Sequence, residues 1–280
     1  MEIGASVLPL FPRDTTDRNR TSPVAFTGNK FEFRSVGSSL SIAGPNIVLN
    51  TIMAESLARF ADELEQAEDF RTALDELIRR TIRAHRRVLF DGNSYSEEWV
   101  EEARRRGLPN LRTTPDALAQ YATPKNIAVF ERHHVLTADE IRSRCEIMLE
   151  NYAKTLHIEA VTMRDCVKRA ILPASLAYQN RVAELAERKT RLNLPVSVET
   201  RELIHLGALT ESLVDRLERL TADIMGESEG SSAQELAFFC RDHIAADMRS
   251  LREVVDELET RVPAEDWPYP SYGDLLYSVR

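Results

Sequence analysis

Two long segments near the end of the chain repeat apolar residues at alternating steps of three and four. The first carries Leu206, Leu213, Leu217, Leu220 and Ile224, and the second carries Ile244, Met248, Leu251, Val255, Leu258 and Val262. This spacing places the apolar side chains along one side of a helix, as in a bundle or coiled coil. The pattern therefore predicts two long helices that pack in an antiparallel bundle.

Helical spacing of apolar residues also occurs earlier in the chain. Apolar positions between Ile47 and Leu64 predict a helix that begins at Gly44-Pro45, because proline suits the first helical turn. Glycine and proline turn signals then separate further expected helices at residues 67–90, 95–106 and 125–133. The middle of the chain is therefore predicted to be helical as well.

Another long helix is expected to begin near Thr137, which lies three residues before Glu140 in a capping-box pattern. Pro173 interrupts the apolar stripe that follows. Because proline lacks a backbone N–H and clashes with the carbonyl four residues earlier, a kink or break is expected there. The polar stretch 226–232 is expected to be an interhelical loop, and about two thirds of the chain should be helical.

The first 44 residues depart from the helical pattern. They hold four of the ten glycines, whereas no glycine occurs between Gly107 and Gly207. We expect loops and short strands there, either poorly ordered or paired in a hairpin, because a lone strand leaves its backbone groups unpaired. The predicted fold class is mainly α: a strand-and-loop piece, residues 1–44, precedes a long-helix antiparallel bundle, residues 45–280.

Composition excludes several classes of protein. The 280 residues carry 36 basic and 45 acidic side chains, a net charge of −9, which argues against a general nucleic-acid binder. The chain has neither a transmembrane run of about 18 apolar residues nor a signal-peptide pattern at its first residues. Its three cysteines lie far apart, so a disulfide framework is not expected and a reducing cytoplasm is the default location. We expect no nucleic-acid partner and no membrane partner.

Residues 30–34 alternate between charged and aromatic side chains. As a strand, this segment places Phe31 and Phe33 on one face, where they could anchor it against a core. Lys30, Glu32 and Arg34 then form a row on the other face. Such a row suits a polyanion with a metal ion, because the carboxylate binds the ion and the cations bind phosphate or carboxylate oxygens. Alternation alone favours the simpler alternative, a solvated face with a ladder of salt bridges.

The wider sequence around that strand carries a specific resemblance. Residues 17–37, DRNRTSPVAFTGNKFEFRSVG, resemble the late catalytic segment of glutamine synthetases, most closely those of type III. The resemblance covers nearly the whole chain in order, including the stretches at residues 36–52, 94–99, 107–115 and 267–276. The chain thus resembles the C-terminal part of such an enzyme: the last catalytic segment and a helical C-terminal domain.

The resemblance implies a reaction and roles for four residues. The reaction is the ATP-dependent ligation of ammonia to glutamate through γ-glutamyl phosphate, with Mg²⁺ or Mn²⁺ as cofactor. Glu32 resembles the carboxylate that binds the divalent ion, and Arg34 the arginine that holds glutamate and its acyl phosphate. Arg20 matches the loop arginine near the transferred phosphoryl group, and Lys30 stands where classical families carry an arginine at the nucleotide phosphates. Ring assemblies in the family imply a homo-oligomer.

Complete glutamine synthetases have several hundred residues before this segment, and these supply the other metal ligands and the ammonia site. We therefore expect the chain to be inactive alone, whether it is a truncated reading frame or a separate subunit. The alternative is a non-catalytic helical assembly or regulatory module that retains an unused motif.

Other side chains that might carry chemistry are expected to be structural. Adjacent His133 and His134 point about 100° apart on a helix and cannot chelate one ion together. The basic run at residues 79–87 is most simply the C-terminal end of a helix, where cations favour the dipole.

Overall fold

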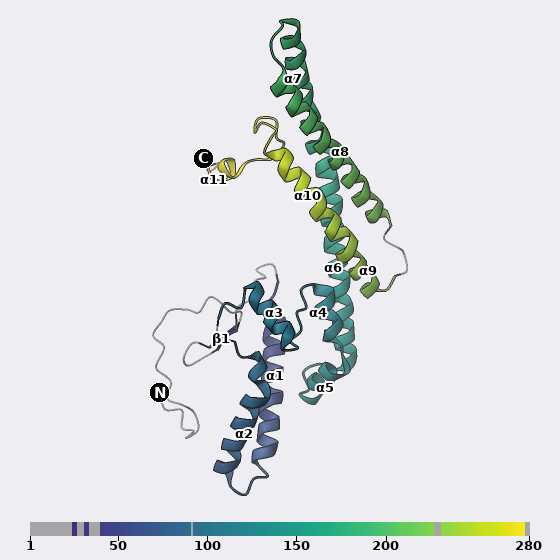
Figure 1. Cartoon of the computed structure of the whole chain (residues 1–280). Helices are drawn as coiled ribbons and strands as arrows, with labels where there is room; N and C mark the ends of the chain where they lie inside the picture. Colours follow the sequence, from purple (N-terminus) through teal and green to yellow (C-terminus); the bar gives the residue numbers. More distant parts are fainter. Residues whose placement is uncertain (1–23, 27–30, 34–39, 91, 227–230, 278–280) are drawn as a thin grey trace. The chain divides into compact units, whose positions relative to one another are not determined.

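The computed structural model describes residues 24–26, 31–33, 40–90, 92–226 and 231–277 (Figure 1). Helices account for nearly all regular structure in these residues, which confirms the mainly α fold class. The chain divides into two compact units. The first unit comprises residues 1–112 and 120–141, and the second comprises residues 113–119 and 142–280. The domain boundary expected between residues 44 and 45 stays a prediction.

A short antiparallel hairpin in the first unit contains β1 (Val24–Phe26) and β2 (Phe31–Phe33). Ala25 pairs with Glu32 at its centre. The hairpin agrees with the expectation that a strand here needs a neighbour. The expectation of two aromatic anchors is wrong, because Phe31 is 73% exposed and Phe33 48% exposed. Alternation placed the two rings on one face, but no core of the described residues covers that face.

The helices of the first unit mostly follow the predicted ranges. They are α1 (Ala43–Leu64), α2 (Phe70–His85), the 3₁₀ turn η1 (Arg86–Val88), α3 (Glu97–Arg105) and α5 (Pro124–Arg132). Helix α2 begins at residue 70 because the Asp69 side chain accepts hydrogen bonds from the backbone N–H groups of Arg71 and Thr72. Helix α4 (Thr114–Tyr121), which crosses the boundary between the units, was not expected.

The core of the first unit is small. Ile127 and Phe130 of α5 are buried together with Ile141, and Val48 of α1 packs against them. Tyr121 also contributes, with its ring centroid 6.3 Å from that of Phe130. Helix α5 is thus held to α1 and to the start of the next helix by a few apolar side chains.

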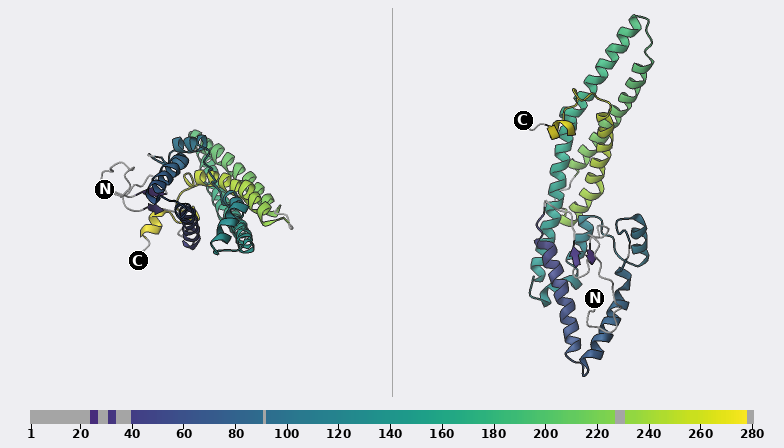
Figure 2. Two further views of the ribbon diagram at one scale, coloured as in Figure 1. Left: turned by 90° about the horizontal axis from the view of Figure 1, so that it is seen from below. Right: turned by 90° about the vertical axis from the view of Figure 1, so that its left-hand side faces the viewer.

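The second unit is a bundle of long helices (Figure 2). Its elements are α6 (Ala138–Cys166), η2 (Val167–Ile171), α7 (Leu172–Arg191), α8 (Ser197–Met225), α9 (Ala233–Phe239), η3 (Cys240–Ile244), α10 (Ala245–Glu259) and α11 (Tyr272–Tyr277). The first four residues of α6 belong to the first unit. Helices α7 and α8 form an antiparallel hairpin, and α10 packs along α8. The predicted long helices and their antiparallel packing are confirmed.

The apolar stripes form the core of this bundle. Helix α8 buries all five residues that the spacing singled out: Leu206, Leu213, Leu217, Leu220 and Ile224. Leu251, Val255 and Leu258 of α10 face the same cluster. Ala153 and Ala160 of α6 complete it with small side chains. The heptad-like spacing therefore marks intrachain core.

The capping box predicted at the start of α6 is confirmed, and at Pro173 the structure has a π-helical turn instead of a break. The Glu140 carboxylate accepts a hydrogen bond from the Thr137 backbone N–H at 2.8 Å, and the Thr137 hydroxyl accepts one from the Glu140 N–H at 3.3 Å. Before Pro173 the chain widens into the π-helical turn η2, where the Leu172 N–H bonds to the Val167 carbonyl. This turn accommodates the proline without ending the helix. In the described residues, no helix is long and apolar enough to cross a membrane.

Candidate functional site

Of the four residues predicted to carry catalysis, the structure describes Glu32. It lies in the middle of β2 and is half-buried, whereas the two phenylalanines on either side of it are exposed. Arg20, Lys30 and Arg34 lie outside the described residues. The row of Lys30, Glu32 and Arg34 on one strand face therefore stays a prediction from alternation.

Glu32 suits a divalent ion through the chemistry of its side chain, because Mg²⁺ and Mn²⁺ favour carboxylate oxygens. Such an ion needs about six ligand atoms in fixed geometry. The described residues contain no group of three or more His, Cys, Asp or Glu side chains placed to hold a metal. Glu32 can thus supply one ligand, and a complete site requires further oxygen donors.

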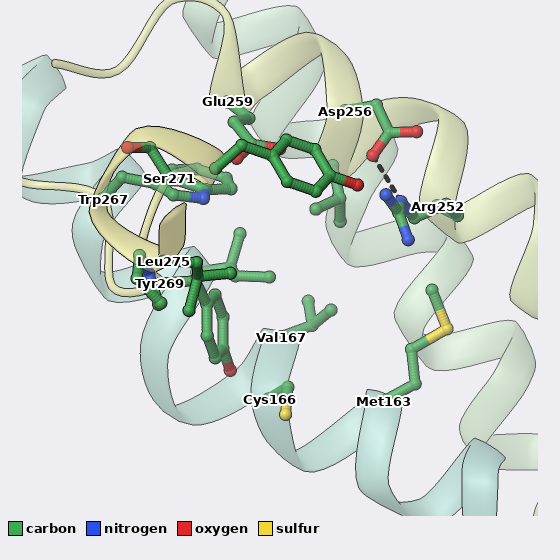
Figure 3. A pocket seen from close by; sticks show the side chains of 14 residues that line it. Met163, Cys166, Val167, Arg252, Asp256, Glu259, Trp267, Tyr269, Ser271 and Leu275 are labelled. Carbon is green, nitrogen blue, oxygen red and sulfur yellow. Dashed lines mark hydrogen bonds and ion pairs between the residues drawn. The ribbon is translucent and has the colours of Figure 1, made fainter. Parts of the chain in front are cut away.

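A pocket of about 460 Å³ in the second unit is a second candidate site (Figure 3). One wall is the end of α6 with η2, which contributes Met163, Cys166 and Val167. Another is the C-terminal half of α10, and the third is the segment from Trp267 to Leu275. The aromatic residues of that segment carry part of the family resemblance, but no sequence pattern predicted a pocket there.

Several polar contacts hold the segment that closes the pocket. The Tyr269 hydroxyl and the Cys166 thiol share a hydrogen bond, which together with burial raises the pKa of Tyr269 to about 12. Asp266 forms an ion pair with Arg181 of α7. The Ser271 backbone N–H donates to the Asp274 carboxylate at 2.9 Å, which caps the short helix α11. The pocket therefore has a defined wall.

Charged groups stand at one side of the pocket. Arg252 is paired with Asp256 four residues later on α10, as the dashed line in Figure 3 shows. Glu259 lies one turn beyond Asp256 and has no ion pair among the described residues. The three groups together carry one surplus negative charge.

A carboxylate with several cationic neighbours lies in the first unit. Glu55 of α1 has a side chain only 10% exposed and accepts from Arg59 at 2.6 Å and from Arg132 at 3.4 Å. The His133 ring nitrogen Nε2 lies 2.9 Å from its other oxygen. The hydrogen bond with His133 is the main cause that lowers the pKa of Glu55. This cluster joins α1 to the end of α5, so we assign it to packing.

The basic run lies at the C-terminal end of α2 and in η1, as the sequence predicted. Arg83 and His85 are in the last turn of the helix, where the dipole favours cations. Arg80 reaches Glu63 of α1 at 2.5 Å. These positions agree with the structural interpretation of the run.

Comparisons with known proteins give the class of this helical fold. Residues 73–190 match the family model described as the glutamine synthetase C-terminal domain. That match covers α3, α4, α5 and α6 completely, together with most of α2 and α7. The helices are therefore those of a glutamine synthetase C-terminal domain.

Similarity to curated proteins extends over the rest of the chain. The chain is 39% identical to a type-3 glutamine synthetase of Dictyostelium discoideum, over 99% of this chain and 39% of the relative. It is 38% identical to a glutamine synthetase of Butyrivibrio fibrisolvens, over 96% of this chain and 39% of the relative. A glutamine synthetase of Bacteroides fragilis is 33% identical over 99% of this chain and 40% of the relative.

Residues 73–190 thus belong to the glutamine synthetase C-terminal domain family, and nearly the whole chain is similar to proteins named glutamine synthetase, one of them a type-3 glutamine synthetase. The chain spans about two fifths of the length of the curated relatives that it matches. This confirms the resemblance on which the site prediction rests, including the helical C-terminal domain.

Proposed function

We propose that this chain is part of a glutamine synthetase and serves the ATP-dependent ligation of ammonia to glutamate. Residues 1–44 supply late catalytic side chains, and residues 45–280 form a helical domain for assembly into a homo-oligomer. The observation that carries the proposal is similarity to proteins named glutamine synthetase along 96–99% of the chain. Cys145, Cys166 and Cys240 form no disulfide in the described part of the chain, which suits a reducing cytoplasm.

Each site residue has a proposed role that follows the family resemblance. Glu32 would hold the Mg²⁺ or Mn²⁺, which would offset negative charge on the phosphates of ATP, and Lys30 would contact those phosphates as a point charge. Arg34 grips the glutamate carboxylate and the acyl phosphate formed from it with its planar guanidinium. Arg20 neutralises charge at the phosphoryl group in transfer.

The reaction divides into two displacements. A γ-carboxylate oxygen of glutamate attacks the terminal phosphorus of ATP, the bond to the β-phosphate oxygen breaks, and ADP leaves. Ammonia then attacks the acyl carbon, inorganic phosphate leaves, and a proton is lost from nitrogen. Both steps concentrate negative charge, so the contribution of the cationic side chains is to position the anions and stabilise that charge.

The experiment that tests the proposal uses a hybrid enzyme. This chain replaces the matching part of the Dictyostelium relative, and glutamine formation is measured against Mg²⁺ and Mn²⁺ concentration. Glu32→Gln removes the charged oxygen ligand, so we expect a lower maximal rate and a higher metal requirement. Glu218→Gln, at an exposed position of α8, is the matched control.

An unchanged rate and metal requirement in Glu32→Gln, equal to those of the control, would contradict the metal assignment. A fully active hybrid with that substitution would favour the alternative of a helical assembly or regulatory module with an unused motif.

A further inference from the structure

The pocket beside α10 has no part in the proposed reaction, and its lining points to a ligand of its own. Its walls combine the aromatic side chains of Trp267, Tyr269 and Tyr272 with the aliphatic or thioether groups of Met163 and Val167. Such walls receive an apolar body, which is removed from water on binding. At about 460 Å³ the pocket has the size of a small-molecule site.

The segment from Trp267 to Leu275, which closes over this space, is held both before the pocket and within it. Before the pocket, the Trp267 N–H donates to the Pro263 carbonyl at 3.0 Å, and Asp266 pairs with Arg181. Within it, the Tyr269 hydroxyl bonds to the Cys166 thiol. A ligand therefore meets a surface that is already formed, which lowers the entropy cost of binding.

The charged side chains at the pocket favour a ligand that carries a positive charge. Arg252 is paired with Asp256, and the exposed Glu259 carboxylate adds a second negative charge that acts on the same Arg252. An anion would be repelled by the surplus negative charge of these three groups, whereas an ammonium group would offset it. Aromatic faces add to the preference for positive charge, because their π-electrons attract cations.

We propose that this pocket binds a small organic cation: an apolar or aromatic body that carries a primary ammonium group. The body lies against Trp267, Met163 and Val167, and the ammonium group lies at Glu259 near the exposed ring of Tyr272, which is 85% accessible. This inference is independent of the glutamine synthetase proposal, since none of its residues lies in the segment 17–37.

The test titrates the full 280-residue chain with three probes of matched shape: phenethylammonium, 2-phenylethanol and 3-phenylpropionate. Calorimetry measures affinity, and the methyl resonance of Met163 reports whether the probe enters the pocket. We expect the ammonium probe to bind at least about fivefold more tightly than the alcohol, which corresponds to about 1 kcal/mol. The carboxylate probe should bind more weakly than both.

Variants identify the charge responsible. Glu259→Gln keeps the shape of an exposed side chain and should reduce the preference for ammonium over alcohol to about twofold or less. Glu218→Gln, equally exposed but on α8, should leave the preference unchanged. Trp267→Leu should weaken the ammonium and alcohol probes alike, because it removes the shared apolar wall.

Three results would overturn the proposal. They are equal binding of the ammonium and alcohol probes, a preference that survives Glu259→Gln, and the absence of any Met163 shift at millimolar ammonium probe. Glu259 and Glu218 both lie at exposed helix positions, so neither substitution should disturb folding. A changed preference between the probes therefore reports a change in binding.

Discussion

Glu32 illustrates how the surroundings of a strand decide which of its faces is covered. Its neighbours Phe31 and Phe33 are largely exposed, although phenylalanine is the residue type expected inside. The β1–β2 pairing satisfies backbone groups in the hairpin, while the aromatic face of β2 stays largely exposed in the part of the chain that the structure describes. Strand alternation separates two faces and leaves the choice between them to tertiary packing.

The assignment of Arg34 predicts a large effect of a conservative substitution. In the active hybrid enzyme, Arg34→Lys should lower kcat by on the order of 10²-fold or more, as removal of one preorganised transition-state donor does. Lysine keeps the positive charge but lacks the planar fork that holds a carboxylate or acyl phosphate at two points. Steady-state kinetics measure the change.

Lys30→Arg is the matched control for Arg34→Lys. It should be nearly silent, because it restores the residue type that classical families carry at this position. A salt-bridge ladder on a solvated strand predicts small and equal effects for both substitutions. If Arg34→Lys leaves turnover within about threefold of the parent, the catalytic role of this strand is refuted.

The Glu55 cluster gives a pH-dependent prediction for stability. Hydrogen bonding to His133 holds the pKa of Glu55 below its ordinary value of 4.5. The charged Glu55 carboxylate therefore stabilises the fold fully above pH 4.5, and this stabilisation is lost as pH falls through the lowered pKa. Glu55→Gln should lower the unfolding temperature at pH 7, and the difference from the parent should narrow in acid. Thermal unfolding followed by circular dichroism at several pH values tests this.

Glu63→Gln is the comparison for that experiment, because Glu63 pairs with Arg80 at a more exposed position. Its effect should be smaller at every pH. If Glu55→Gln and Glu63→Gln lowered the unfolding temperature equally, the buried position of Glu55 would add nothing to the packing of α1 against α5.

At the scale of elements, the second unit contains the π-helical turns η2, between α6 and α7, and η3, between α9 and α10. Only η2 was signalled in the sequence. Pro173 accounts for η2, because a residue without an N–H is accommodated by a locally wider turn. No proline or glycine lies in η3, where the Ala245 N–H bonds to the Cys240 carbonyl. Cys240 and Ile244 are fully buried there, so core packing sets the register.

Close to η3, a pair of acidic side chains joins α8 to α10. Burial and a hydrogen bond with Asp223 raise the pKa of Asp247, with Arg219 and His243 nearby as opposing charges. Because the pKa is raised in the folded protein, the fold favours the protonated form of the Asp247 carboxyl. This stabilisation is complete below the ordinary pKa of 3.8 and is lost as pH rises through the raised pKa. Asp247→Asn should therefore raise the unfolding temperature at pH 7 and change it little below pH 3.8.

Asp215→Asn serves as the control for Asp247→Asn, since Asp215 is an exposed residue of α8. The explanation by a raised pKa of Asp247 would be ruled out if Asp247→Asn stabilised the protein equally at pH 3 and pH 7, or no more than the control does. Chemical denaturation at the two pH values provides an independent measurement.

For the whole molecule, the sharpest prediction is that the chain alone makes no glutamine. Glu32 contributes one oxygen-bearing side chain, and a hard divalent ion requires several in fixed geometry. Incubation of micromolar chain with glutamate, ammonia, ATP and Mg²⁺ or Mn²⁺ should yield no glutamine above the background without protein. Formation that Glu32→Gln abolishes would contradict this and show that the chain holds the remaining ligands.

Local physical chemistry was sufficient to predict much of this fold from sequence. The five apolar residues of α8, the Thr137 capping box and the interruption at Pro173 were each recognised, because helix periodicity, end capping and proline geometry depend on neighbouring residues. Family resemblance supplied the site roles of Arg20, Lys30, Glu32 and Arg34, which alternation alone did not distinguish from a solvated strand.

Tertiary structure decided the features that depend on residues far apart in the chain. The pocket exists because Trp267 and Tyr269 return to Cys166 at the end of α6, about 100 residues earlier, and helical spacing cannot report such a contact. The exposure of Phe31 and the π-helical turn at Cys240 likewise follow from what packs against each segment. Local pattern specifies which side of an element is apolar, and only three-dimensional packing specifies what covers that side.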